Sequence, residues 1–143
     1  MTTDIDRTRR VELLAGLDAE PLVALADRCL GRVDPVIVQE PEVGMVMLPV
    51  REPVAHERFY LGEVLVTRAE VELDGHRGWS MRLGDDRAAT LAAAICDAVV
   101  ESGGPEAADV VELCRWSAEA AAAAERAEWA ELASTEVTFE ELD

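Results

Sequence analysis

The chain has 143 residues, half of them apolar, and a formal net charge of −17 with no lysine among its thirteen basic residues. A chain of this length is expected to form one domain, and the apolar half of its residues is enough for a core. The excess of acids argues against nucleic acid and anionic membrane surfaces as partners, because both are bound through Lys and Arg. Twelve acids and two arginines lie in residues 101–143, so this third is either a solvated surface or a docking site for a basic partner.

Two short helices are predicted at the start of the chain. Residues 9–17 place valine and leucine close to the i, i+3, i+4 spacing of an amphipathic helix. Asp18 can cap a second helix, Pro21 suits its first turn, and Gly31 ends it.

Strands are predicted to follow. Residues 36–38 are β-branched and lie between Pro35 and Pro41, which we expect to bound a short strand. Residues 44–51 are apolar with a weak alternation and form a second short strand.

A β-hairpin is predicted in the middle of the chain. Residues 59–73 form the longest candidate strand, and Gly62 marks a turn or bulge near its start. From Val64 onward a mostly apolar face alternates with a mostly charged face. Asp74 and Gly75 are a hairpin turn signal, and residues 79–83 alternate as the return strand.

Two helices and a tail complete the chain. Residues 87–101 carry an apolar stripe of helical period, and residues 106–133 include an alanine run of high helix propensity. In the tail, residues 134–143, Val137 and Phe139 alternate with polar residues, which favours either addition to this sheet or pairing with another chain. We therefore predict one α+β domain over residues 1–143, with an antiparallel sheet of about four strands, two N-terminal helices, a helix after the hairpin and a long C-terminal helix.

The sequence offers little for metal or nucleophilic chemistry. His56 and His76 are twenty residues apart without a Cys or His partner at ligand spacing, so no metal site is predicted. Cys29, Cys96 and Cys114 lie on apolar helix faces and are interpreted as buried, reduced thiols. No secretory signal and no apolar run of about 18 residues is visible, so we expect a cytoplasmic protein.

The arginines of the hairpin have two interpretations. Arg58 and Arg68 share parity along the strand, and Arg82 lies on the return strand, so their guanidinium groups could together hold a phosphate or phosphonate. The alternative, which we favour, is cross-strand pairing with nearby glutamates, among them Glu63.

The order of residues from 57 to 97 resembles the G subunit of the bacterial carbon–phosphorus lyase system, the PhnG family. The specific part is Glu-Arg-Phe at residues 57–59 followed by Gly-Glu at 62–63 and Thr-Arg-Ala at 67–69. Gly78-x-Ser80, the N-terminal Arg-x-x-x-Leu-Leu-Ala helix and the terminal Val137-x-Phe139 are also similar, so that the resemblance covers nearly the whole chain.

The resemblance implies a subunit of a cytoplasmic complex that degrades phosphonates, with the I, H and J subunits and the L component as partners. With I, H and L, a G subunit supports the transfer of the ribose triphosphate of ATP onto methylphosphonate, with release of adenine. It implies no cofactor of the chain's own, since the iron–sulfur cluster and S-adenosylmethionine belong to the J subunit. No catalytic residue is assigned. The substrate or interface candidates are Arg58, Glu63, Thr67, Arg68 and Arg82, and the partner-docking candidates are Val137 and Phe139.

Overall fold

Four helices and a three-stranded antiparallel sheet make up the part of the chain that the computed structural model describes, residues 5–137. The fold is α+β, as predicted. The elements in chain order are α1 (Arg7–Gly16), α2 (Ala19–Leu30), β1 (Val36–Arg51), β2 (Arg58–Leu73), β3 (His76–Leu83), α3 (Arg87–Ser102) and α4 (Ala107–Ala133).

The sheet has the order β1-β2-β3, so the prediction of about four strands is one too many. The two short strands expected at residues 36–38 and 44–51 are a single strand, β1, which pairs with β2 along its length. Pro41 does not end this strand, because β1 lies at the sheet edge, where a missing N–H is tolerated. The register shifts between Gln39 and Glu42, which accommodates the proline.

The β2 strand contains the bulge that its glycine predicts. Leu48 is opposite Gly62 while Pro49 is opposite Tyr60, so Leu61 is an extra residue on β2. The bulge separates the part of the hairpin that leads to its tip from the part that pairs with β3.

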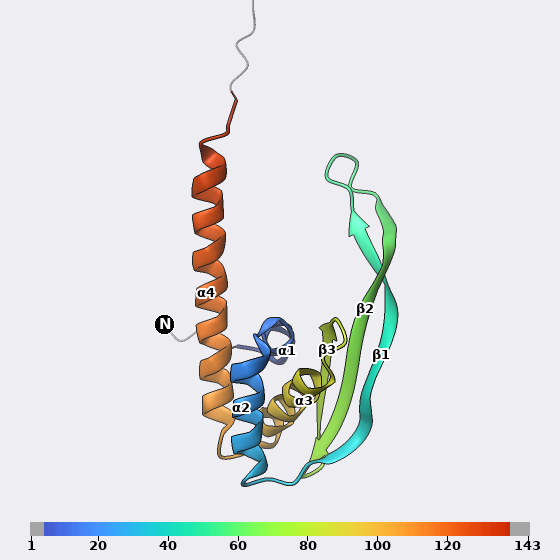
Figure 1. Ribbon diagram of the computed structural model, residues 1–143, viewed down its shortest axis with the longest axis vertical. Coiled ribbons are helices and arrows are strands. Elements are labelled where there is room, and N and C mark those ends of the chain that lie inside the picture. Colours follow the sequence, from blue (N-terminus) through green and yellow to red (C-terminus); the bar gives the residue numbers. More distant parts are fainter. Residues whose placement is uncertain (1–4, 138–143) are drawn as a thin grey trace, which may run out of the picture.

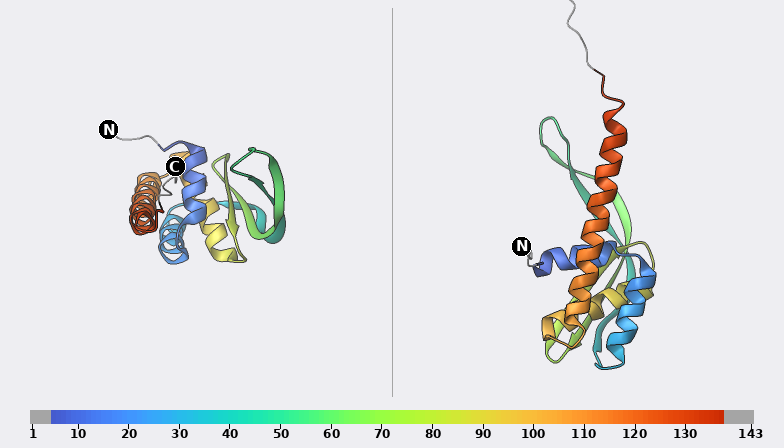
Figure 2. Two further views of the ribbon diagram at one scale, coloured as in Figure 1. Left: turned by 90° about the horizontal axis from the view of Figure 1, so that it is seen from above. Right: turned by 90° about the vertical axis from the view of Figure 1, so that its left-hand side faces the viewer.

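The core lies between one face of the sheet and α3, with α1, α2 and α4 beyond it (Figures 1 and 2). Small side chains let α3 approach closely: a Cβ at Gly78 would stand 2.1 Å from the Ala94 carbonyl oxygen and 2.6 Å from the Ala98 Cβ. Asp86 caps α3 by accepting a 2.9 Å hydrogen bond from the Ala89 N–H.

Two elements extend away from this core in the same direction, the hairpin of β1 and β2 and the C-terminal part of α4 (Figure 1). The buried residues of α4 are Val110 and Cys114, both in its first third. Beyond α4, Val137 is 70% exposed. Phe139, the other predicted docking residue of the tail, lies outside the described residues, so the strand predicted there stays a prediction.

Candidate functional site

The predicted site residues on β2 are spread along the strand and do not form one cluster. Arg58 begins β2 and Arg68 lies ten residues further on, which in an extended chain is about 30 Å. Glu63 lies between them, exposed and opposite Met47. The structure therefore does not bring Arg58, Arg68 and Arg82 together around one anion.

Arg82 holds the end of α1 against the sheet. Its Nη1 donates to the Leu14 carbonyl and its Nη2 to the Leu17 carbonyl, each at 2.7 Å. Leu14 lies in the last turn of α1 and Leu17 is its C-cap, and carbonyls at a helix end lack partners within the helix. Burial lowers the pKa of the Arg82 guanidinium, although the carboxylates of Asp86 and Asp18 oppose this shift. Both terminal nitrogens of the guanidinium therefore already donate to backbone carbonyls of this chain.

Thr67 is a buried residue of the sheet, opposite Arg82 on β3. Its Oγ1 donates a 2.7 Å hydrogen bond to the carbonyl of Gly84, just after β3. This hydrogen bond holds the short segment between β3 and α3 in place, and the hydroxyl has no access to solvent.

Arg68 faces solvent on the sheet surface that the helices do not cover. Its Nη2 lies 4.0 Å from a carboxylate oxygen of Glu42, its neighbour on β1. An exposed pair of this kind contributes about 0–1 kcal/mol, so the guanidinium is available to another partner. Two glutamates of β2 pair with Arg77 on β3, which lies 3.5 Å from Glu70 and 3.0 Å from Glu72. Glu63, which is also predicted to pair, has no ion pair within residues 5–137.

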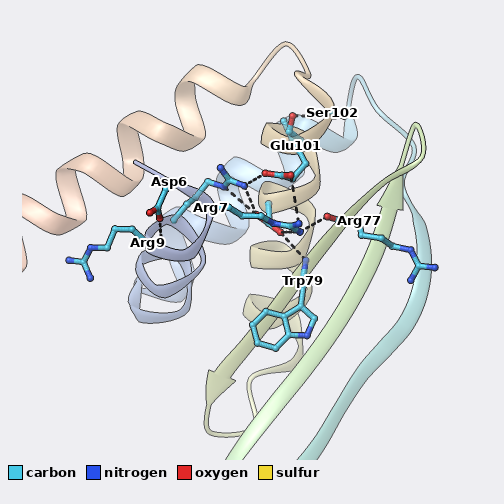
Figure 3. A network of polar contacts seen from close by, with 10 residues as sticks. Asp6, Arg7, Arg9, Arg77, Trp79, Glu101 and Ser102 are labelled. Atoms are coloured by element: carbon cyan, nitrogen blue, oxygen red, sulfur yellow. Dashed lines mark hydrogen bonds and ion pairs between the residues drawn. The ribbon is translucent and has the colours of Figure 1, made fainter. Parts of the chain in front are cut away.

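A buried ionic network, which the sequence analysis did not identify, joins α1, α3 and β3 (Figure 3). The Asp97 carboxylate is fully buried. It accepts hydrogen bonds from Arg10 Nη2 at 2.8 Å, from Arg7 Nη2 at 2.9 Å and from the backbone N–H of Trp79 at 3.1 Å. Glu101 pairs with Arg10 as well. The hydrogen bond to Asp97 raises the pKa of Arg7, which keeps it charged.

The signal for this network is present in the sequence. Asp97 lies within the apolar stripe of α3, next to Cys96 and one turn after Ala93. An acid at a core position of a helix requires a cation, because a buried unpaired carboxylate is unfavourable. The sequence does not say which of thirteen arginines supplies it, and that choice depends on how α1 packs.

A largely apolar groove of about 500 Å³ runs between α1 and the hairpin. Its walls come from four elements, α1, β1, β2 and β3. The residues that line it are Val11, Glu12, Ala15, Gly16, Val46, Leu48, Val64, Val66, Trp79, Met81, Arg82 and Leu83. Apolar side chains outside the groove are exposed too, including Met45, Met47, Phe59 and Tyr60 along the hairpin. Exposed apolar surface on this scale marks an interaction site.

The helix α4 also exposes large apolar side chains. Trp116, Trp129 and Leu132 are each about half exposed or more. A groove of about 600 Å³ lies between α2 and α4, where Arg28 and Asp109 form a 2.7 Å ion pair at its rim. Exposed tryptophans are typical of protein interfaces.

The described residues do not gather metal-binding or reactive groups. Among residues 5–137 no cluster of three His, Cys, Asp or Glu side chains is placed to hold a metal ion. The three cysteines are free and buried, as predicted. Burial raises the pKa of the Cys114 thiol to about 11. None of the helices in the described range is both long enough and apolar enough to cross a membrane.

Comparison with known proteins gives one assignment. The model of the family described as "Phosphonate metabolism protein PhnG" matches residues 5–142. A search of the curated proteins finds no match to the chain. Because the family match covers nearly every residue, including the hairpin and both long helices, the chain belongs to the PhnG family and has a role in phosphonate metabolism.

Proposed function

We propose that this chain is a subunit of the cytoplasmic carbon–phosphorus lyase core complex, with the I, H and J subunits and the L component as partners. In that company it supports the transfer of the ribose triphosphate group of ATP onto methylphosphonate. The chain carries no cofactor of its own, ATP is a substrate of the complex, and the iron–sulfur cluster and S-adenosylmethionine belong to the J subunit.

The observation that carries the proposal is the exposed apolar surface on the hairpin and α4. Met45, Met47, Tyr60 and Trp129 are each more than half exposed, on elements that extend away from the core (Figure 1). A single domain rarely leaves so much apolar area in water. A chain built to pack against other subunits explains it, and the family's role in phosphonate metabolism supports the identity of those subunits.

The chemistry suits a chain that assists and does not react. A phosphonate oxygen forms a bond to C1′ of the ribose as the bond from C1′ to adenine breaks, and adenine leaves with the bonding electrons. The nucleophile is the substrate itself, so the protein needs to orient the two substrates and stabilise the departing base. A net charge of −17 opposes ATP binding by this chain alone, so partners supply most of the cationic surface.

Reconstitution tests this function. Adenine release from ATP and methylphosphonate is measured by chromatography for the I, H and L proteins with and without this chain, and for this chain alone. We expect release only when all four proteins are present. Turnover by the isolated chain, or undiminished turnover in its absence, would refute the proposal.

The alternative is a scaffold, or an oligoanion-binding module, without turnover of its own. Arg68 separates these possibilities because its only described ionic contact is the 4.0 Å pair with Glu42. If Arg68→Ala slows turnover in a complex shown by native mass spectrometry to be intact, the pure scaffold is excluded. Arg115→Ala, in the first third of α4, is the matched control for the loss of one positive charge, because its only ion pair within residues 5–137 is the exposed one with Glu112. Methylphosphonate or ATP binding by the isolated chain in calorimetry would favour the module.

A further inference from the structure

The tip of the hairpin places two arginines directly opposite each other. Arg51, the last residue of β1, is the register partner of Arg58, the first residue of β2. Residues paired in this way lie on the same face of the sheet with Cβ atoms about 4.5–5.5 Å apart, and like charges there repel. An anion bound between two such arginines would offset the repulsion between their positive charges.

The neighbouring carboxylates do not pair with these arginines. Glu52 and Glu57 follow and precede the two arginines just outside the strands, and no ion pair within residues 5–137 joins either glutamate to Arg51 or Arg58. The Glu52 carboxylate accepts from the backbone N–H groups of Val54, at 2.9 Å, and Ala55. These hydrogen bonds lower the pKa of Glu52, with the bond from Val54 as the largest cause. The carboxylate holds the loop and does not neutralise the arginines.

The lack of a partner distinguishes this pair from most of the other arginines. Within residues 5–137, ten of the thirteen contact a carboxylate or a backbone carbonyl, and Arg51, Arg58 and Arg126 do not. In a chain with a net charge of −17, most arginines readily find an acid. Two of the three that do not are register partners at one end of the hairpin.

The same face carries a further donor. Tyr60 is two residues from Arg58 on β2, on the tip side of the bulge at Leu61, and it is 62% exposed. Its side chain therefore lies on the same face of β2 as that of Arg58. Val54, in the loop, is 86% exposed, as expected of a tip that is buried only when the hairpin inserts into a partner.

We propose that Arg51 and Arg58 form an oxyanion site that binds a phosphate-type group of a substrate, the triphosphate of ATP or the phosphonate, when the hairpin tip inserts into the assembled complex. The inference rests on the proposed function. Two planar guanidinium forks on one face match the tetrahedral array of phosphate oxygens, which each fork binds bidentately. Tyr60 donates a hydrogen bond at the rim. The partner encloses the site and so strengthens its electrostatic interactions.

The test compares Arg51→Gln and Arg58→Gln with Arg115→Gln, which removes one positive charge from the first third of α4 and, among the described ion pairs, breaks only the exposed one with Glu112. In the assembled complex, KM is measured separately for ATP and for methylphosphonate. Binding of inorganic tripolyphosphate and of methylphosphonate is measured by equilibrium dialysis, which needs no turnover. Each tip variant should weaken one of these anions by about ten- to a hundredfold, as expected for the loss of a charged hydrogen-bonding group. The control should change it less than twofold.

The pattern of results identifies the source of the anion. If only the tip variants raise KM for ATP and weaken tripolyphosphate binding, the arginine pair binds the triphosphate of ATP. If they raise KM for methylphosphonate alone, the pair binds the phosphonate. Partial recovery in Arg51→Lys and Arg58→Lys supports charge recognition at the site. If the Gln variants assemble normally and both anions bind as before, the site does not exist. If they fail to assemble while the Lys variants do, the arginines contact carboxylates of a partner, which also overturns the proposal.

The two proposals can fail separately. A wild-type complex that binds tripolyphosphate through Arg51 and Arg58 without releasing adenine keeps this site and removes the transferase function. A complex that releases adenine at the same rate and KM with both tip variants keeps the function and removes the site.

Discussion

Arg10 and Asp97 form an ion pair inside the domain, with Arg10 Nη2 at 2.8 Å and Nε at 3.2 Å from the same Asp97 oxygen. Arg10 is 4% exposed and Asp97 is fully buried. The other Asp97 oxygen accepts from Arg7 and from the Trp79 N–H, as the contacts around Trp79 and Arg7 in Figure 3 show. A single carboxylate therefore connects α1 and β3 to α3.

Replacing this carboxylate should strongly destabilise the domain. In Asp97→Ala the buried Arg10 loses its main counter-ion, and removing one partner of a buried pair costs about 3–5 kcal/mol. Urea denaturation followed by circular dichroism measures the loss. Glu112→Ala is the control, because Glu112 and Arg115 are an exposed pair 3.1 Å apart on α4 and such pairs contribute about 0–1 kcal/mol. Equal losses in the two variants would contradict a structural role for the network.

The contact between β3 and α3 should not tolerate an added methyl group. In Gly78→Ala the new Cβ would meet the Ala94 carbonyl oxygen at 2.1 Å, and since this oxygen is backbone, the strand or the helix has to move. Overpacking of this kind costs about 1–3 kcal/mol or more, seen as a lower midpoint in thermal unfolding. Gly44→Ala, in the same sheet with nothing within 4 Å of its Cβ, should change the midpoint little. Similar midpoints for both variants would show that α3 does not pack as described.

The fold class can be predicted from the sequence because the turns, bulges and helices that define it are specified by short stretches of adjacent residues. The turn between β2 and β3 and the bulge beside Gly62 each depend on a few adjacent residues, and both are present. The strand count fails at Pro41, since a proline ends an inner strand but is tolerated at an edge. Whether β1 is an edge depends on the order of the whole sheet, which no local pattern contains.

The contacts of the predicted site residues could not be read from the sequence when the partner lies far away along the chain. Glu42 of β1 is the strand neighbour of Arg68, so this pair depends on how β1 aligns with β2 and is not contained in the hairpin predicted over residues 59–83. The contact of Arg82 with the Leu14 and Leu17 carbonyls spans more than sixty residues and depends on where α1 packs. The opposition of Arg51 and Arg58 needs the exact register through the bulge, which the sequence does not specify.

Arg82→Gln should loosen α1 without affecting the hairpin tip. The shorter, neutral side chain loses two charged hydrogen bonds to the end of α1, each of which contributes about 1.5–3 kcal/mol. Hydrogen exchange followed by mass spectrometry should show faster exchange over residues 7–17. Arg87→Gln is the control, because Arg87 donates to a single exposed carbonyl, that of Pro41. Unchanged exchange in α1, together with lost activity of the complex, would instead place Arg82 at the substrate.

The thiol of Cys114 should make stability depend on pH in the alkaline range. Burial raises its pKa from 9.0 to about 11, so between these values the folded state binds more protons than the unfolded state, and stability falls as pH rises. The contribution is fully present below pH 9 and is lost by about pH 11. Cys114→Ala should therefore lose less stability than the wild type between pH 8 and pH 10.5, by about 1–2 kcal/mol. Parallel pH profiles for the two proteins would contradict the burial of this thiol.

The C-terminal part of α4 should be required for assembly and not for folding. The buried residues of α4 are Val110 and Cys114, and Ala118 packs against the core, while Trp129 lies beyond it with its side chain exposed. A chain that ends at Ala121 should keep its stability within about 1 kcal/mol, because it loses exposed surface and no described core contact. It should no longer co-purify with the I subunit when the two are co-expressed. Trp129→Ala in the full chain separates a loss of apolar contact from a loss of helix length. Normal co-purification of the shortened chain would assign the docking role to the hairpin alone.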